Sequence, residues 1–406
     1  MPLDRRPIWI GASIVVLVVA VLVGTGIFPV FKKRAPKTEL TVWGLDSPSV
    51  WEPIVAQYHK DNPSVTVTYR ALSAATYEND LVNGLATGQG PDIFMIGNAW
   101  LPKHGSKLAP APANIITAAQ ADTLFPAAVS QDFAVASAVY ALPLYMDTLA
   151  LIYNRDTFDA KGVATPPTDW AGLQELSRRL GKGSVALGGS DATIEGASDI
   201  LALLLMQSGA PMAGTDGKIS FRGGEGALSF YAKFADPRSA YYAWDGKQPS
   251  AFRRFAAGNL PMLFGYHSEA AALAAANPAL RIGIAPLPQN AGAAVNAPSY
   301  AGLAVWAKSA HPNEAWQFVK TLTAVPEKAG AYAAATNNPP ALRALVSGFD
   351  ANPFLATFAR QTLTARSWPR RDEASARAAL SAVIESVHGG AGAEQALREA
   401  EDALNR

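Results

Sequence analysis

Hydrophobic and polar residues follow two regular patterns in the first part of the chain beyond position 37. Short apolar or alternating runs predict strands at 39–43, 64–69 and 92–96. Between them, apolar side chains spaced three or four residues apart predict helices within 47–63 and at about 77–87. This alternation is typical of a mostly parallel, three-layer α/β unit, in which ligands bind beyond the carboxyl ends of the strands.

The rest of the chain is richer in helix. The same reasoning predicts helices at 170–180, 194–208, 226–234, 377–387 and 392–404, strands at 260–264 and 281–285, and a strand that runs into a helix near Pro312. At 406 residues, the chain exceeds the size at which one hydrophobic core keeps growing. We therefore expect two lobes.

The N-terminal segment has a different character. Residues 8–23 (IWIGASIVVLVVAVLV) carry no charge, and the uncharged stretch continues to Phe31. About 20 apolar residues cross a bilayer, and no small-residue cleavage site follows, so we expect residues 1–31 to be an uncleaved transmembrane anchor and 32–37 a basic linker. Two arginines precede the span and four basic residues follow it, which on charge alone places the body on the cytoplasmic side.

Net charge and cysteine content exclude several classes of function. The formal charge is +1, but residues 1–37 hold six basic residues and one acidic residue, so the remaining 28 basic and 32 acidic residues leave the body at −4. A nucleic-acid-binding protein needs a basic surface, so we expect no nucleic-acid partner. The absence of cysteine excludes disulfides, thiolate metal sites and a cysteine nucleophile.

The chain lacks the common catalytic and phosphate-binding motifs. It has no GxSxG, HExxH, GxxxxGK[ST] or GxGxxG sequence, and its five histidines show no metal-ligand spacing. Asp147 and Glu269 could be nominated as a glycosidase pair, but nothing in their spacing singles them out. Glu269 is better explained as a carboxylate at the start of a helix. We therefore expect neither enzyme activity nor a cofactor.

Aromatic residues occur near the predicted strand ends, beside polar side chains. Flat rings stack on the C–H faces of sugars, Asp, Asn and Arg bind the hydroxyl groups, and a cleft is expected where strands meet loops. The candidates from this reasoning are Trp43, Asp46, Ser47, Asn98, Trp100, Tyr145, Tyr266, Tyr300 and Trp368.

An ordered series of motifs carries a family resemblance. The motifs are LTVWG…WEPIVAQYHKDNPSVTVTY, LATGQGPDIFMIGNAWL, YALPLYMDTLALIYNRDTFDAKGVATPPTDWAGLQEL, AFRRFAAGNLPMLFGYHS, IGIAPLPQ and SYAGLAVWAKSAHPNEAWQFVKTLT. Over residues 38–406 the chain resembles the extracellular solute-binding proteins of bacterial ABC importers, and within them the maltose-binding-like, carbohydrate-type branch.

The resemblance implies a two-lobed, periplasmic-binding-protein-like fold whose chain crosses three times between three-layer α/β lobes. The implied ranges are 38–143 and 266–322 for the first lobe, 148–260 and 327–406 for the second, and 144–147, 261–265 and 323–326 for the hinge crossings. A solute held between the lobes closes the hinge, and the closed form is presented to an ABC permease. This places the body on the extracellular or periplasmic side, against the charge rule.

The resemblance also implies which residues contact the solute. These are Trp43, Asp46 and Ser47 after the first strand, Asn98 and Trp100 after the third, Tyr145 and Asp147 at the first crossing, Tyr266 and His267 after the second, Tyr300 before GLAVWAK, and Arg366 and Trp368 in ARSWPRR. The family's usual Gly-Pro-Trp or Gly-Ser-Trp step is Gly-Tyr-His in this sequence, at 265–267.

Asp147 is the first choice among these positions. The run YALPLYMDTLALIYN (140–154) is apolar and strand-like except where 143–148 interrupt it, and a carboxylate buried in such a run is costly. Two strands, 140–142 in one lobe and 149–153 in the other, with the crossing between them, would direct Asp147 into the interlobe cleft. Water or a solute hydroxyl would satisfy it there.

Together these inferences predict a membrane-tethered binding protein for a carbohydrate-like solute, single-pass in the cell membrane. Its linker of six residues reaches about 20 Å, which keeps the lobes near a permease in the same bilayer. The alternatives are a non-sugar solute, namely a polyamine, a metal ion or a polyol phosphate, and a surface glycosidase on a similar scaffold.

Overall fold

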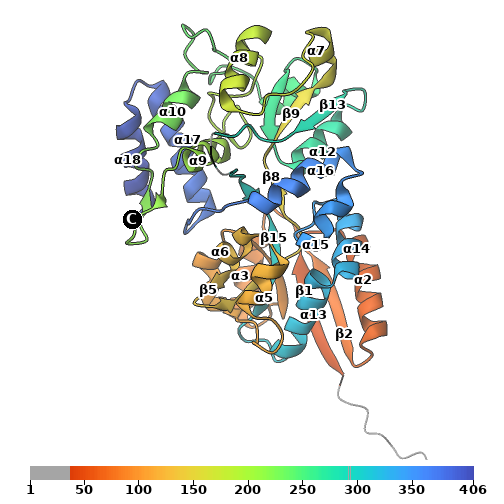
Figure 1. Ribbon diagram of the computed structural model, residues 1–406. Helices are drawn as coiled ribbons and strands as arrows, with labels where there is room; N and C mark the ends of the chain where they lie inside the picture. The colour runs from red at the N-terminus through yellow and green to blue at the C-terminus, as the bar shows by residue number, and fades with distance from the viewer. Residues whose placement is uncertain (1–36, 291, 293) are drawn as a thin grey trace, which may run out of the picture.

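The computed structural model describes residues 37–290, 292 and 294–406, which form two lobes (Figure 1). The predicted anchor at 1–31 and residues 32–36 of the predicted linker lie outside the described residues. Within the described part of the chain, no helix combines the length and the apolar character that a bilayer span requires.

The first lobe is built on a mixed sheet of six strands. In spatial order these are β2 (Val65–Ala71), β1 (Thr38–Gly44), β3 (Ile93–Gly97), β15 (Ala301–Trp306) and β4 (Leu108–Ala109), with β7 (Ala141–Pro143) also paired to β15. β1 runs parallel to β2 and β3, whereas β15 runs antiparallel to β3, β4 and β7.

Helices lie on both faces of this sheet (Figure 1). They are α2 (Pro48–Asp61), α3 (Tyr77–Thr87), α4 (Leu101–His104), α5 (Ala118–Leu124), α6 (Ala127–Phe133), α13 (Pro312–Ala324), α14 (Pro326–Thr336) and α15 (Arg343–Val346). A hairpin of β5 (Ala134–Val135) and β6 (Ala138–Val139) follows α6.

The hydrophobic pattern explains the layering of the first lobe. Residues 93–96 of β3 are all buried, because helices cover both faces of the sheet at this strand. Trp51 of α2 is fully buried and stacks on Tyr69 of β2, with ring centroids 4.4 Å apart. α3 ends at Gly88, whose φ of 75° is the left-handed conformation that glycine adopts most readily.

The second lobe has a smaller, antiparallel sheet of three strands. They lie in the order β12 (Met262–Gly265), β9 (Ala150–Asn154) and β13 (Ile282–Ala285), and a short pair is formed by β10 (Met212–Ala213) and β11 (Ile219–Ser220). The helices are α7 (Arg155–Ala160), α8 (Trp170–Leu180), α9 (Ala197–Gln207), α10 (Glu225–Ala232), α11 (Ala251–Ala256), α12 (His267–Ala276), α16 (Pro353–Gln361), α17 (Glu373–His388) and α18 (Ala393–Leu404).

The first two crossings between the lobes lie side by side. β8 (Asp147–Thr148) pairs with β14 (Pro298–Ser299) in a two-stranded sheet between the lobes (Figure 1). Met146 belongs to the first hydrophobic core and Leu149 to the second, so the first crossing overlaps the predicted interval 144–147. The chain returns to the first core at Tyr300.

The second crossing therefore differs from the prediction of 261–265. Those residues form β12, which pairs with β9 inside the second lobe, and α12 and β13 follow in the same lobe. The predicted assignment of 266–297 to the first lobe is wrong for the same reason. β12 ends at Gly265, close to the predicted end of the strand at 264. The helix that follows, α12, packs on the second lobe, to which β12 belongs.

The third crossing also lies later than predicted. Residues 323–326 contain the end of α13 and the start of α14, and both helices pack on the first lobe. Tyr332 of α14 meets the edge of Trp51 at 6.4 Å between ring centroids. Leu342 belongs to the first core and Leu345 packs against it, whereas Phe354 and Phe358 of α16 belong with the second core, so the chain crosses between 345 and 354. Ala365, after α16, contacts the first core again.

Candidate ligand-binding site

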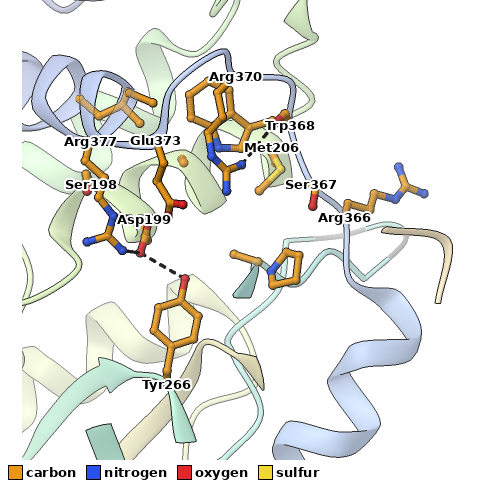
Figure 2. A pocket seen from close by; sticks show the side chains of 15 residues that line it. Ser198, Asp199, Met206, Tyr266, Arg366, Ser367, Trp368, Arg370, Glu373 and Arg377 are labelled. Atoms are coloured by element: carbon orange, nitrogen blue, oxygen red, sulfur yellow. Dashed lines mark hydrogen bonds and ion pairs between the residues drawn. The ribbon is translucent and has the colours of Figure 1, made fainter. Parts of the chain in front are cut away.

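Two cavities lie on the surfaces where the lobes face each other. The larger, of about 410 Å³, is lined from the first lobe by Glu78, Ala99, Trp100 and Lys103, and from the second lobe by Arg371, Asp372, Glu373, Ala374 and Arg377. The smaller, of about 20 Å³, is drawn in Figure 2. Its walls come from α9, α17, Tyr266, Pro298 and the segment 366–370. Glu373 and Arg377 line both cavities, which are therefore neighbours.

Asp132, at the end of α6, connects the two lobes. Its Oδ2 accepts hydrogen bonds from Tyr300 Oη at 2.7 Å and Asn98 Nδ2 at 3.2 Å, both in the first lobe. The same oxygen accepts a bond of 2.5 Å from Ser367 Oγ in the second lobe. Burial raises the pKa of the Asp132 carboxyl to about 6, although these donors and the nearby Arg370 lower it.

Lys103 forms an ion-pair bridge across the larger cavity. Its Nζ lies 2.8 Å from Glu78 Oε1 in the first lobe and 2.9 Å from Asp372 Oδ2 in the second. The hydrogen bond from Lys103 is the main reason that the pKa of Asp372 falls to about 2. Asp372 also accepts from Ser375 N as the N-cap of α17.

A second charged group lines the smaller cavity. Asp199 Oδ2 accepts a hydrogen bond from Tyr266 Oη at 3.1 Å and forms an ion pair with Arg377. The dashed lines that meet at Asp199 in Figure 2 mark these two interactions. Arg377 Nε also lies 3.8 Å from Glu373 Oε1. Burial raises the pKa of Asp199, and the charge of Arg377 opposes that rise.

Two tryptophan rings border the cavities from opposite lobes. Trp100 of the first lobe is half-buried, with its ring centroid 6.1 Å from that of Tyr77 and 5.3 Å from that of His104. Trp368 of the second lobe is only 8% exposed and packs edge-on against Phe221. The guanidinium of Arg370 lies 5.5 Å from the Trp368 ring centroid.

Six of the predicted contact residues meet around the two cavities and Asp132. They are Asn98, Trp100, Tyr266, Tyr300, Arg366 and Trp368. Two segments of the first lobe and two of the second supply them, so no single stretch of sequence contains the site.

Asp147 does not face an open cleft, and that part of the prediction is wrong. It is 4% exposed, and its carboxylate accepts three backbone hydrogen bonds, from Thr148 N at 2.8 Å, His267 N at 2.9 Å and Ser268 N at 3.2 Å. Two of these donors begin α12, so Asp147 ties the hinge strand to a helix N-terminus. Burial raises its pKa to about 7, against the lowering effect of the three donors.

Tyr145 and His267 flank Asp147 in the hinge. Tyr145 forms an isolated β-bridge with Pro340 and is half-buried. His267 is 2% exposed, its ring lies edge-on to Phe354 and Phe358, and burial lowers its pKa to about 4. Neither ring nitrogen of His267 has a hydrogen-bond partner among the described residues. Both side chains pack against apolar neighbours.

The three predicted contacts after β1 serve local structure. Asp46 Oδ2 accepts from Trp51 Nε1 at 3.0 Å and from Tyr332 Oη at 2.9 Å, which fastens α14 to the end of β1. Ser47 is the N-cap of α2 and accepts from Ser49 N. Trp43 packs so closely on α3 that a Cβ on Gly84 would lie 2.8 Å from its ring.

The sequence prediction missed several polar residues of the site. They are Glu78, Lys103, Asp132, Asp199, Arg370, Arg371, Asp372, Glu373 and Arg377. Two features of the sequence point to them: Asp199 is a carboxylate directly before the apolar run ILALLLM, and ARSWPRRDEASAR concentrates charges beside a tryptophan. Across 37–290, 292 and 294–406, no three His, Cys, Asp or Glu side chains form a group that could hold a metal ion.

Comparisons with known proteins bear on the family and the fold of the chain. A family model for bacterial extracellular solute-binding proteins matches residues 44–329. A putative binding protein of Brucella abortus (strain 2308) is 22% identical over 141 residues, which cover 35% of this chain and 33% of that protein. The chain therefore aligns with about a third of the length of the curated relatives that it matches.

Solved structures resemble nearly the whole described chain. The cyclic alpha-maltosyl-1,6-maltose binding protein from Arthrobacter globiformis has a TM-score of 0.76 at 19% identity, covering 91% of this chain and 98% of that chain. The sugar-binding protein MalE from Xanthomonas citri also has a TM-score of 0.76, at 18% identity, with coverages of 91% and 96%. These likenesses confirm the predicted two-lobed α/β fold.

Proposed function

Because the chain belongs to the family of bacterial extracellular solute-binding proteins, we propose that it captures a carbohydrate-like solute between its two lobes and delivers it to an ABC permease. The body lies on the extracellular or periplasmic side, and residues 1–31 hold it to the membrane as a single-pass anchor. The proteins that it is similar to are binding proteins, which fits a role without turnover.

The observation that carries this proposal is the cavity of about 410 Å³ between the lobes, with an aromatic ring at its border. Its volume falls in the range of small-molecule sites. Trp100 offers a ring for the C–H face of a sugar. Within the described part of the chain, the donors to Asp132 all bind Oδ2, so Oδ1 would serve as the acceptor for a solute hydroxyl.

Several proteins of similar structure bind the same solute class. They include a cyclic alpha-maltosyl-1,6-maltose binding protein and an ABC substrate-binding protein of Listeria monocytogenes in complex with cycloalternan. We propose Asn98, Trp100, Tyr266, Tyr300, Arg366 and Trp368 as residues that contact the solute or position Asp132. Asp147 acts in the hinge instead, through its bonds to the start of α12.

A thermal-shift screen tests the proposal. The full chain is purified in a detergent without a sugar headgroup, because a maltoside could occupy the site. Sugars, polyols, polyol phosphates, polyamines and metal ions are added in turn, and the melting temperature is followed against concentration. We expect a saturable rise with at least one carbohydrate and no conversion of it in the same sample. A response confined to polyamines or metal ions would overturn the carbohydrate proposal, and product formation would favour a glycosidase.

A further inference from the structure

The charges around the cleft are unequally paired. Each carboxylate that lines the two cavities in the described chain has a cationic partner. Lys103 pairs with Glu78 and Asp372, at 2.8 and 2.9 Å. Arg377 pairs with Asp199 and, at 3.8 Å, with Glu373. These two cations are therefore engaged in holding the walls of the cleft.

Three other arginines of the cleft have no such carboxylate partner among the described residues. Arg366 and Arg370 line the smaller cavity and Arg371 lines the larger. Among residues 37–290, 292 and 294–406, no carboxylate lies within 4.0 Å of the guanidinium of any of the three. Arg370 donates only to the backbone oxygen of Trp368, at 3.2 Å, and Figure 2 shows its guanidinium among the side chains that line the pocket.

Asp132 is another carboxylate near these arginines, but its Oδ2 is hydrogen-bonded to other residues. Its Oδ2 already accepts from Tyr300, Asn98 and Ser367. Arg370 acts on its charge from beyond ion-pair distance. Arg370 is half-buried, whereas Arg366 and Arg371 are exposed at the rim of the cleft. A half-buried guanidinium without a carboxylate has lost part of its hydration, which a bound anion would compensate.

We propose that the solute is an acidic carbohydrate whose carboxylate or phosphate group binds Arg370 and Arg371, an inference that rests on the proposed carbohydrate function. The planar fork of arginine matches either anion in a bidentate geometry. The hydroxyls of the same solute would meet Asp132, and its ring would meet Trp100. The site would thus recognise two features of one ligand, a sugar ring and an acid group.

The experiment compares matched ligands on the full chain in a neutral detergent without sugar. Glucuronate, glucose and glucose 6-phosphate form one set, and galacturonate, galactose and galactose 6-phosphate a second, each titrated by calorimetry. We expect the acidic members of a set to bind at least tenfold more tightly than the neutral sugar, and this preference to shrink as salt is raised. The uronate and phosphate members distinguish the two kinds of acid group.

Each other outcome has a defined meaning. If the neutral sugar binds as tightly as its acidic relatives, the inference fails and the proposed function stands. If no sugar of either kind binds, both fail. In Arg371→Gln and Arg370→Gln we expect the affinity for the acidic ligand to fall at least tenfold, and by a clearly larger factor than the affinity for the neutral sugar. Equal losses for both ligands would overturn the inference. Arg238→Gln, at an exposed arginine paired with Asp236 on its own turn, is the control.

Discussion

Asp132 in the cleft and Asp147 in the hinge are aspartates at the same junction, and they are held by different kinds of donor. Asp147 is 4% exposed and receives three backbone N–H groups. Asp132 is half-buried and receives three side-chain donors, one of them from the opposite lobe. The backbone donors to Asp147 are fixed by the fold of the hinge. The donor from Ser367 to Asp132 comes from the other lobe, so it would be lost if the lobes moved apart.

The difference separates a structural role from a binding role. The carboxylate of Asp147 is satisfied inside the hinge, so a solute has nothing to add to it. Among the described residues, the hydrogen-bond donors to Asp132 all bind Oδ2, and one of them, Ser367, comes from the opposite lobe. We therefore expect substitutions at Asp147 to act on the unliganded protein and substitutions at Asp132 to act on binding.

The largest effect is expected for Asp147→Ala. The change leaves three backbone N–H groups without their acceptor, two of them on the buried residues Thr148 and His267, and should lower the free energy of unfolding by about 3 kcal/mol. Urea denaturation of the unliganded protein measures it. Asp350→Asn, at an exposed ion pair, should change the value by less than about 0.5 kcal/mol. An unchanged free energy of unfolding in Asp147→Ala would contradict the structural role assigned to Asp147.

For Asp132→Asn we expect the main loss in solute affinity. Replacing an ionised acceptor by an amide should weaken binding of the ligand that the screen identifies by about tenfold or more, roughly 1.4 kcal/mol. The denaturation midpoint should move less than in Asp147→Ala. Calorimetric titration measures the affinity, and Asp350→Asn is again the control. A variant that binds normally but unfolds easily would reverse the assignment of the two aspartates.

Asp132 should also leave a signature in the pH dependence of stability. Since its pKa is about 6 in the folded protein and about 4 in the unfolded chain, the folded state holds an extra proton between these values. Its stabilising contribution is present below about pH 4 and is lost as pH rises through 6, by up to about 1.4 kcal/mol per pH unit.

Denaturation at pH 4.5 and 6.5 in the wild type and Asp132→Asn isolates this contribution. His267, with its pKa of about 4, acts in the opposite direction over the same range, but it does so in both proteins. The unfolding free energy of the wild type should fall more steeply between the two pH values than that of the variant. Parallel slopes would contradict the assignment.

The smallest effect is expected for Lys103→Gln. Its side chain and that of Asp372 are 45% and 30% exposed, so losing the pair should cost less than about 1 kcal/mol of stability. It does remove a contact between the lobes, so we expect a larger radius of gyration in X-ray scattering without solute. Lys328→Gln breaks a comparable pair, with Asp61, inside one lobe and should leave the radius unchanged. Equal radii in all three proteins would show that this bridge does not hold the lobes together.

The hydrophobic pattern was sufficient for the first five elements of the first lobe, β1 to β3. α3 places Tyr77, Leu81 and Leu85 on one buried face, which is a local spacing that the sequence displays directly. The second crossing was beyond such reasoning. Whether the strand before Gly265 leaves its lobe depends on its pairing with β9, and nothing in the residues around 265 records a partner more than a hundred positions earlier.

The residues of the candidate site also differ in how visible they are in the sequence. Trp100 and Trp368 were found because large rings near strand ends and charges are visible in the sequence. Asp132 was not, because its donors Tyr300 and Ser367 lie 168 and 235 positions away and its own helix shows only an ordinary polar residue. Asp147 was noticed for a sound reason, an acid in an apolar run, but its partners are main-chain groups of α12 that any residue could supply.

The position of β15 has a consequence for how the chain is made. This strand lies between β3 and β4 in the first sheet, yet it is synthesised after all three strands of the second sheet. A growing chain therefore cannot complete its N-terminal lobe first, as domains ordinarily do during translation. The edge of β3 waits unpaired until residue 306 has emerged, by which point the sheet of the other lobe is already available. The first sheet is therefore completed only after the three strands of the second have been made.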